Sequence, residues 1–278
     1  FDYKRYLYLH NIYKTFTITG YDNIEIINRN NLGFAYQRII YPARKFASDN
    51  IDEHIGGNEG AFLKGLVTGE RADISKKTKE DFVKAGVMHI IAVSGLNVAY
   101  IILALTLILS LFRVPRTPKA IITLIILIFY CFFTGAPASI IRATVMGSLL
   151  LISGLMQRKT NFYNIIGISV LIILVYESKQ LFDPGFILSF SAVLSMVIFY
   201  EKLDTVILQR IENSKSKFNR ILYFVLSVIF VSFAAQIGTL PITSHYFEKI
   251  SFISLAANAI VVPLSNLSLA IGFFQISA

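Results

Sequence analysis

Seven long runs of apolar residues constrain this chain more than any other feature of its sequence. Of the 278 residues, 55% are hydrophobic, and the mean hydropathy is +0.62. A helix needs about 17–25 residues to cross the hydrocarbon core of a bilayer, and these runs are continuously apolar, unlike the alternating strands of a membrane β-barrel. The sequence therefore predicts a mainly α polytopic membrane protein with about seven spans. The runs are 88–112, 120–135, 139–157, 160–176, 184–200, 221–247 and 250–278, and Arg142 is the only Asp, Glu, Lys or Arg within them.

Basic residues in the short connections between the runs are distributed unequally. We call the face of the membrane at which the first run ends side A and the opposite face side B. The connections on side B contain only two basic residues, Lys179 and Lys249. Because short cytoplasmic loops carry an excess of Lys and Arg, we expect side A to be cytoplasmic and residues 1–86 to be extracytoplasmic, since long segments are translocated largely regardless of charge. Side A receives Arg113, Arg116, Lys119, Arg158, Lys159, Lys202, Arg210, Lys215, Lys217 and Arg220.

The residue pattern divides the chain into three parts. In residues 1–29, aromatic or branched side chains alternate with polar ones, which predicts β-strands from the tail of a small barrel domain. In residues 30–86 the apolar spacing is helical and predicts a connector of amphipathic helices, on the membrane surface or packed on the spans. Residues 87–278 hold the apolar runs. Because the sequence starts at Phe1 and is still apolar at Ala278, we expect it to be part of a longer protein.

The basic residues of the first two parts allow two interpretations. Interleaved with tyrosines, they could bind single-stranded nucleic acid through phosphate attraction and base stacking. They could also face solvent or lipid headgroups, and this interpretation is favoured because basic patches are common beside membranes.

Polar residues within the apolar runs are the candidate functional residues. Ser94, Gly95 and Asn97 lie at the start of the first run, where a plain membrane anchor needs none of them. A broken helix survives in a membrane only against protein or a water-filled cavity, so this group could interrupt the helix beside an aqueous path. Arg142, four residues into its run, either faces such a path or extends to the interface.

Other polar residues of the runs have simpler default explanations. Hydrogen bonds between helices are the default explanation of Gln236, Asn258 and Asn266. Close helix packing is that of Ser139, Ser189, Ser191 and Ser195. The sequence has no phosphate-binding loop, its four histidines are dispersed, and its single cysteine, Cys131, lies in an apolar run. We therefore expect no catalytic site, no metal site and no cofactor in this chain.

Five motifs occur in order along the last two thirds of the chain. They are GLVTGE (65–70), FVKAGVMHIIAVSGL (82–96), SIIRA (139–143) with Met146, DPGF (183–186) with LSF (188–190), and AQ (235–236) with Pro241, Phe247, Ser251, Asn258 and Pro263. In this order and spacing they resemble the ComEC family of competence proteins, over about residues 60–278.

The resemblance implies a multi-pass channel of the bacterial inner membrane that passes one DNA strand into the cytoplasm during natural transformation. An extracellular domain of the OB type precedes the channel in that family, and many members carry a downstream metallo-β-lactamase-like domain. The implied partners are single-stranded DNA, the bilayer, a DNA receptor outside and an ATP-driven motor inside, and a homo-oligomer is compatible with this assignment. The implied path residues are Ser94, Gly95, Asn97, Ser139, Arg142, Ser189, Gln236 and Asn258.

Two positions depart from the pattern of that family, and two other functions stay open. Asn97 stands where His is common, which removes a titratable group, and Ile187 stands where Gln is common, which removes a polar contact. The main alternative is a secondary transporter for a small anion, with Arg142 as the ligand charge. The absence of a second Ser-Gly-Leu-Asn copy counts mildly against it. The other alternative is a structural membrane scaffold.

Overall fold

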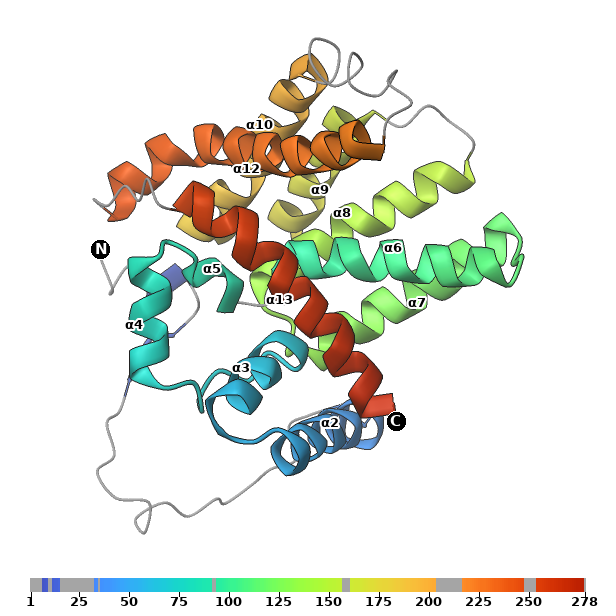
Figure 1. The fold of residues 1–278 in the computed structure, drawn as a ribbon, viewed down its shortest axis with the longest axis vertical. Helices are drawn as coiled ribbons and strands as arrows, with labels where there is room; N and C mark the ends of the chain where they lie inside the picture. The colour runs from blue at the N-terminus through green and yellow to red at the C-terminus, as the bar shows by residue number, and fades with distance from the viewer. Residues whose placement is uncertain are drawn as a thin grey trace.

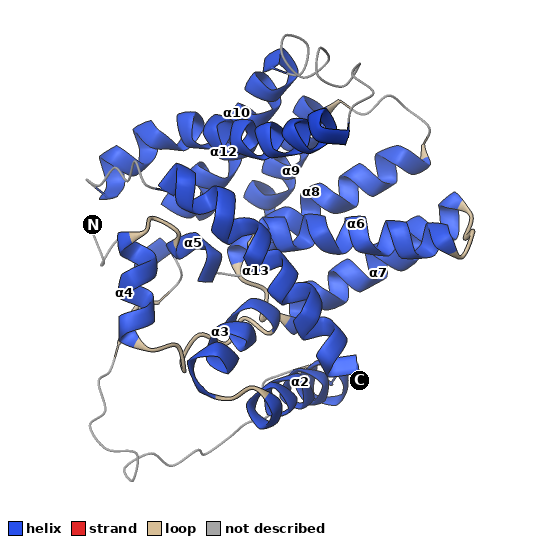
Figure 2. Ribbon diagram, viewed as in Figure 1, coloured by secondary structure: helices blue, strands red, loops and turns tan. Residues whose placement is uncertain are grey.

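The computed structural model describes residues 7–9, 12–15, 33–34, 36–91, 94–156, 161–203, 217–247 and 254–277. Within these ranges the chain is mostly helical and contains no strand, as Figure 2 shows. The mainly α class predicted from the apolar runs is confirmed.

Each apolar run contains one long helix (Figure 1), and the first run also contains the short helix α5 (Met88–Ile91). α7 and α8 are each long and apolar enough to cross a membrane, whereas the apolar parts 95–111, 162–176, 184–199 and 260–275 are shorter than that standard. Seven spans therefore remain a prediction. The helices are α6 (Gly95–Leu111), α7 (Arg116–Phe133), α8 (Ala138–Leu155), α9 (Phe162–Tyr176), α10 (Pro184–Leu203), α12 (Lys217–Phe247) and α13 (Ser254–Ser277).

Prolines and capping residues set the ends of these helices. Pro137 precedes α8 and Pro184 opens α10, positions where a missing N–H costs nothing. Asn161 caps α9, because its side-chain oxygen accepts from the backbone N–H of Tyr163 at 3.0 Å. Gly135 follows the end of α7 with a φ of +82°, which suits glycine, and the N–H of the next residue donates to the carbonyl of Cys131.

The connector is helical, as its spacing predicts. It contains the short π-helix η2 (Tyr36–Ile40), α2 (Tyr41–His54), α3 (Gly57–Val67), α4 (Lys76–Lys84) and α5 (Met88–Ile91). Ser75 caps α4, because its hydroxyl accepts from the N–H of Thr78 at 3.1 Å.

The connector packs on the long helices instead of forming a separate unit. Ile51 and Val67 share one buried core with Val98, Leu127 and Leu269. In Figure 1, α13 runs diagonally across the molecule and reaches α2 and α3 near its C-terminal end. Burial of this common apolar face stabilises both parts together.

The predicted β segment lies almost entirely outside the described residues. Of residues 1–29 the structure describes 7–9, which are helical, and 12–15, which have no regular structure. Strands elsewhere in this segment therefore stay a prediction.

Small residues bring α10 and α12 into close contact. The Ser195 hydroxyl donates to the carbonyl of Ala234 at 2.6 Å, and a Cβ on Gly238 would lie 2.7 Å from the carbonyl oxygen of Ser191. The packing role expected of serines is thus seen at these positions. The short 3₁₀ helix η3 (Ser178–Phe182) joins α9 to α10.

Candidate functional site: polar groups within the helical bundle

The first apolar run is interrupted where Ser94 and Gly95 lie. α5 ends at Ile91, Ser94 has an extended backbone (φ −102°, ψ 160°), and α6 begins at Gly95. The Ser94 hydroxyl donates to Oδ1 of Asn97 at 3.3 Å. The run is therefore two helices with a non-helical join, as the hypothesis of a broken helix requires.

Gly95 lies at a helix crossing. A Cβ at this position would lie 3.1 Å from Cβ of Ala143 in α8, closer than ordinary van der Waals contact. Further along the same crossing, Gly147 faces Ile102. The small residue lets the start of α6 approach α8, so packing explains Gly95 directly.

Asn97 lines a small polar pocket between the helix break and α13, here called the Asn97 pocket. Its volume is about 110 Å³, and it is lined by Ile90, Ser94, Leu96, Asn97, Val262, Ser265 and Asn266. Asn97 is only 5% exposed, and its Nδ2 has no hydrogen-bond partner among the described residues. The Tyr130 hydroxyl, which is also buried and lacks a hydrogen bond of standard geometry among the described residues, interacts with Asn97. A buried donor left unpaired costs about 1–3 kcal/mol, so this amide favours an acceptor, which the Tyr130 hydroxyl or a group in the pocket can supply.

The opposite wall of the Asn97 pocket adds oxygen atoms. The Ser265 hydroxyl and the Asn266 amide nitrogen both donate to the carbonyl of Val262, at 2.9 and 2.7 Å. Their oxygens therefore remain able to accept. The pocket can hold a few waters or a small polar group, which it would bind through neutral donors and acceptors.

Ser265 and Asn266 were not among the predicted site residues, although the sequence carried a signal for them. Together with Asn258 they are spaced seven and eight residues apart, which places them on one face of a helix. Asn258 does not line the pocket, but its Oδ1 is buried and has no partner among the described residues. α13 thus carries a polar stripe in an otherwise apolar helix.

Arg142 is buried beside an acid that sequence analysis did not assign to it. Its side chain is 6% exposed, and Nη1 lies 4.0 Å from Oδ2 of Asp183. Asp183 also caps α10 by accepting from the N–H of Phe186 at 3.0 Å. Nε and Nη1 of Arg142 have no hydrogen-bond partner within the described part of the chain. The arginine does not extend to the surface, and its charge is paired.

The remaining predicted path residues lie elsewhere in the bundle. Ser139 is in the first turn of α8, Ser189 is in α10 and Gln236 is in α12, all half-buried. None of the three lines the Asn97 pocket.

Two basic residues of the connector form ion pairs. Lys64 is 5% exposed and donates to Asp52 at 2.8 Å and to Asp73 at 2.7 Å. Burial alone would lower the pKa of Lys64, but the two carboxylates outweigh it and raise the pKa, while the hydrogen bond from Lys64 lowers the pKa of Asp73. Arg44 pairs with Glu70 at 3.1 Å. These charges fix α2, α3 and the following loop to one another.

Among the residues that the structure describes, no group of three or more His, Cys, Asp or Glu is placed to hold a metal ion.

The comparison with protein families decides the assignment. The profile of the family described as Competence protein matches residues 66–277, which is most of the chain. The chain belongs to the competence protein family. This family membership assigns it a role in competence, in agreement with the ComEC resemblance of its motifs.

One curated relative is similar to nearly the whole length of this competence protein. ComE operon protein 3 of Bacillus subtilis (strain 168) is 27% identical over 263 residues, which cover 95% of this chain and 31% of the relative. The chain thus spans about a third of the length of that relative. No solved structure matches this chain.

The family match covers both polar groups described above. Asn97, Arg142, Asp183 and the wall formed by Ser265 and Asn266 all lie between residues 66 and 277. The Asn97 pocket and the Arg142–Asp183 pair are therefore features of the competence domain itself.

Proposed function

We propose that this competence protein forms part of a multi-pass membrane channel that passes single-stranded DNA into the cytoplasm during natural transformation. The proposal combines family membership with one observation: an apolar helix is interrupted beside a polar pocket that contains a buried, unpaired amide. An interrupted helix in a bilayer needs protein or water to satisfy its backbone, and the pocket supplies that environment.

The chemistry of the Asn97 pocket suits a path for a strand of any sequence. Its neutral donors and acceptors can replace water around phosphate or sugar oxygens without reading base edges. A pocket of 110 Å³ is too small to hold a nucleotide, so in this proposal it forms one wall of the path. Ser94, Asn97, Ser265 and Asn266 are the wall residues.

Arg142 has a positioning role in this proposal. Its paired and buried charge is poorly suited to receive passing phosphates, because a phosphate would have to replace Asp183 in the same place. The same pairing makes it a poor ligand charge for a small anion, so the transporter alternative gains no support from it. The ion pair instead joins α8 to the first turn of α10.

The orientation and partners follow the sequence-based expectations. We propose an inner-membrane protein with residues 1–86 outside the cytoplasm, which receives DNA from an external receptor and depends on a cytoplasmic ATP-driven motor.

The test is uptake of labelled double-stranded DNA into a nuclease-protected cytoplasmic form, in a deletion strain complemented with the full-length gene. The informative variant is Asn97→Leu, which keeps the branched shape of the side chain and removes the amide. Asn164→Leu is the matched control, because Asn164 is exposed on α9 and lies outside the Asn97 pocket.

At equal membrane abundance we expect Asn97→Leu to reduce internalisation at least tenfold while surface binding of DNA persists, and Asn164→Leu to retain internalisation. Normal internalisation with Asn97→Leu would remove the pocket from the path. Normal internalisation in the deletion strain itself, in cells shown to be competent, would refute the channel proposal.

A further inference from the structure

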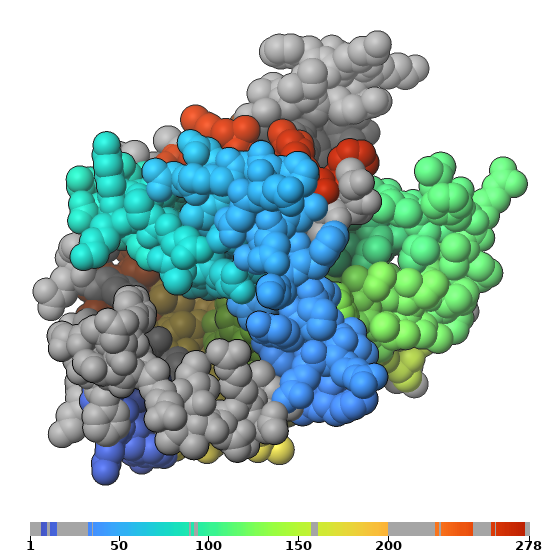
Figure 3. Space-filling view, turned by 90° about the horizontal axis from the view of Figure 1, so that it is seen from below, coloured from blue at the N-terminus to red at the C-terminus, as the bar shows by residue number. Residues whose placement is uncertain are grey.

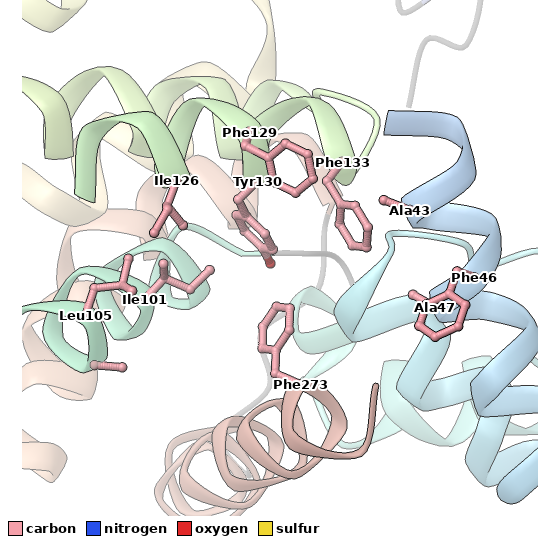
Figure 4. A pocket seen from close by; sticks show the side chains of 11 residues that line it. Ala43, Phe46, Ala47, Ile101, Leu105, Ile126, Phe129, Tyr130, Phe133 and Phe273 are labelled. Carbon is pink, nitrogen blue, oxygen red and sulfur yellow. The ribbon is translucent and has the colours of Figure 1, made fainter. Parts of the chain in front are cut away.

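An apolar groove lies between the connector and the long helices. Its volume is about 440 Å³, and Figure 4 shows its walls: Phe46 and Ala47 from α2, Leu105 from α6, Phe129 and Tyr130 from α7, and Phe273 from α13. The rings of Tyr130 and Phe273 approach each other at a centroid distance of 6.2 Å. This volume is within the range of sites that hold small ligands.

The groove is suited to an apolar chain and not to a polar ligand. All its lining residues except Tyr130 are fully apolar. Its walls continue into exposed apolar residues, such as Leu107 on α6 and Ile125 on α7, on helices expected to face lipid. Figure 3 shows α2 beside the α6 and α7 region on one face of the molecule. An acyl chain from the surrounding bilayer could therefore enter from the side without crossing a polar barrier.

The charges beside the groove select the headgroup. The part of α2 that lines the groove follows Arg38 and contains Lys45, both exposed, whereas its acidic residues Asp49, Asp52 and Glu53 come later in the helix. Arg44 is already paired with Glu70, but Lys45 has no ion pair among the described residues. Neither basic residue lines the groove, but Lys45 lies in sequence between the lining residues Ala43 and Phe46. Arg38 precedes them, and its guanidinium carbon lies 5.2 Å from the centroid of the Phe34 ring. Basic charges next to the groove attract an anion and contribute to anionic lipid binding near a membrane surface.

We propose that this groove binds one acyl chain of a phospholipid with an anionic headgroup, whose phosphate is held by Arg38 and Lys45. The bound lipid would fill the space between α2 and the long helices and fasten the connector to them. The inference rests on the proposed membrane location but does not require DNA transport.

The experiment uses the full-length protein in nanodiscs with phospholipids brominated on their acyl chains, which quench nearby tryptophan fluorescence. The chain contains no tryptophan, so Phe273→Trp places a reporter in the groove, and the parent protein supplies the background to subtract. The probes are brominated phosphatidylglycerol, which is anionic, and brominated phosphatidylcholine, which is zwitterionic.

We expect phosphatidylglycerol to quench the reporter at a bilayer fraction roughly tenfold lower than phosphatidylcholine, because two basic residues contribute. Arg38→Glu with Lys45→Glu should abolish that preference. Lys76→Glu with Lys77→Glu is the matched control, because these lysines are exposed on α4, a helix that contributes no residue to the groove, and it should keep the preference.

A second variant tests the groove itself. Ala104 lines the groove, and Ala104→Phe should fill it and reduce quenching by both lipids. If the two lipids quench the Phe273→Trp reporter equally in the protein that retains Arg38 and Lys45, the choice of headgroup is overturned. Absence of quenching by either lipid would mean that another protein segment or a second copy covers the groove, which also overturns the proposal. Since no DNA is used, these outcomes are independent of the uptake assay.

Discussion

The Arg142–Asp183 pair allows a quantitative test of whether Arg142 has a positioning role. At 4.0 Å, two unit charges attract by about 4 kcal/mol at an effective dielectric constant of 20. Asp183→Asn keeps an acceptor for the N–H of Phe186 but leaves the arginine charge buried and uncompensated, a change that typically costs about 3–5 kcal/mol.

The two single variants should differ in cost. Arg142→Met leaves a carboxylate that still caps α10 and lies at the positive end of its helix dipole, so we expect a loss of about 1–3 kcal/mol. The double variant removes both charges and should be close to Arg142→Met alone. The coupling free energy between the two sites should then equal the cost of Asp183→Asn, about 3–5 kcal/mol.

The assay is SDS-induced unfolding of the purified full-length protein in mixed micelles, measured for the parent, both single variants and the double variant. DNA internalisation is measured in parallel at equal abundance, and the double variant should recover internalisation relative to Asp183→Asn. If the cost of the double variant equals the sum of the two single costs within about 0.5 kcal/mol, the two charges do not interact and the reasoning fails. If the double variant is as stable as the parent but remains inactive, Arg142 acts on DNA and not through Asp183.

Three further predictions concern the packing and charges of the fold. Gly238→Ala should destabilise the protein by about 1–3 kcal/mol by forcing α10 and α12 apart, whereas Gly167→Ala, at a position with open space, should be neutral or stabilise by up to about 1 kcal/mol; SDS unfolding compares the two. Because Lys64 lowers the pKa of Asp73, that carboxylate stabilises the fold above its ordinary pKa of 3.8, and this contribution is lost as the pH falls through the lowered folded value. Stability should thus change less between about pH 5 and pH 3 in Lys64→Met than in the parent, and an equal change would contradict the pairing. Ser75→Ala should cost about 1 kcal/mol and speed hydrogen exchange at the start of α4, and unchanged exchange there would contradict its capping role.

The sequence by itself determined the helical class, because apolar runs and helix-ending residues are local signals. Each of the seven runs contains one long helix, although the first run is interrupted at Ser94. The family could also be recognised from the order of short motifs, since the same linear comparison underlies the family match. Strands in residues 1–29 and the full count of membrane spans stay predictions.

Only the tertiary structure decided which polar residues meet. Arg142 and Asp183 are 41 residues apart and belong to different motifs, and Asn97 meets Ser265 and Asn266 across more than half of the chain. A buried charge or amide requires a partner, but local sequence does not say which element supplies it. The role of Gly95 also depends on tertiary structure, since its proximity to Ala143 follows from how α6 crosses α8. Side-chain chemistry requires these buried groups to have partners, and helix packing determines which residues supply them.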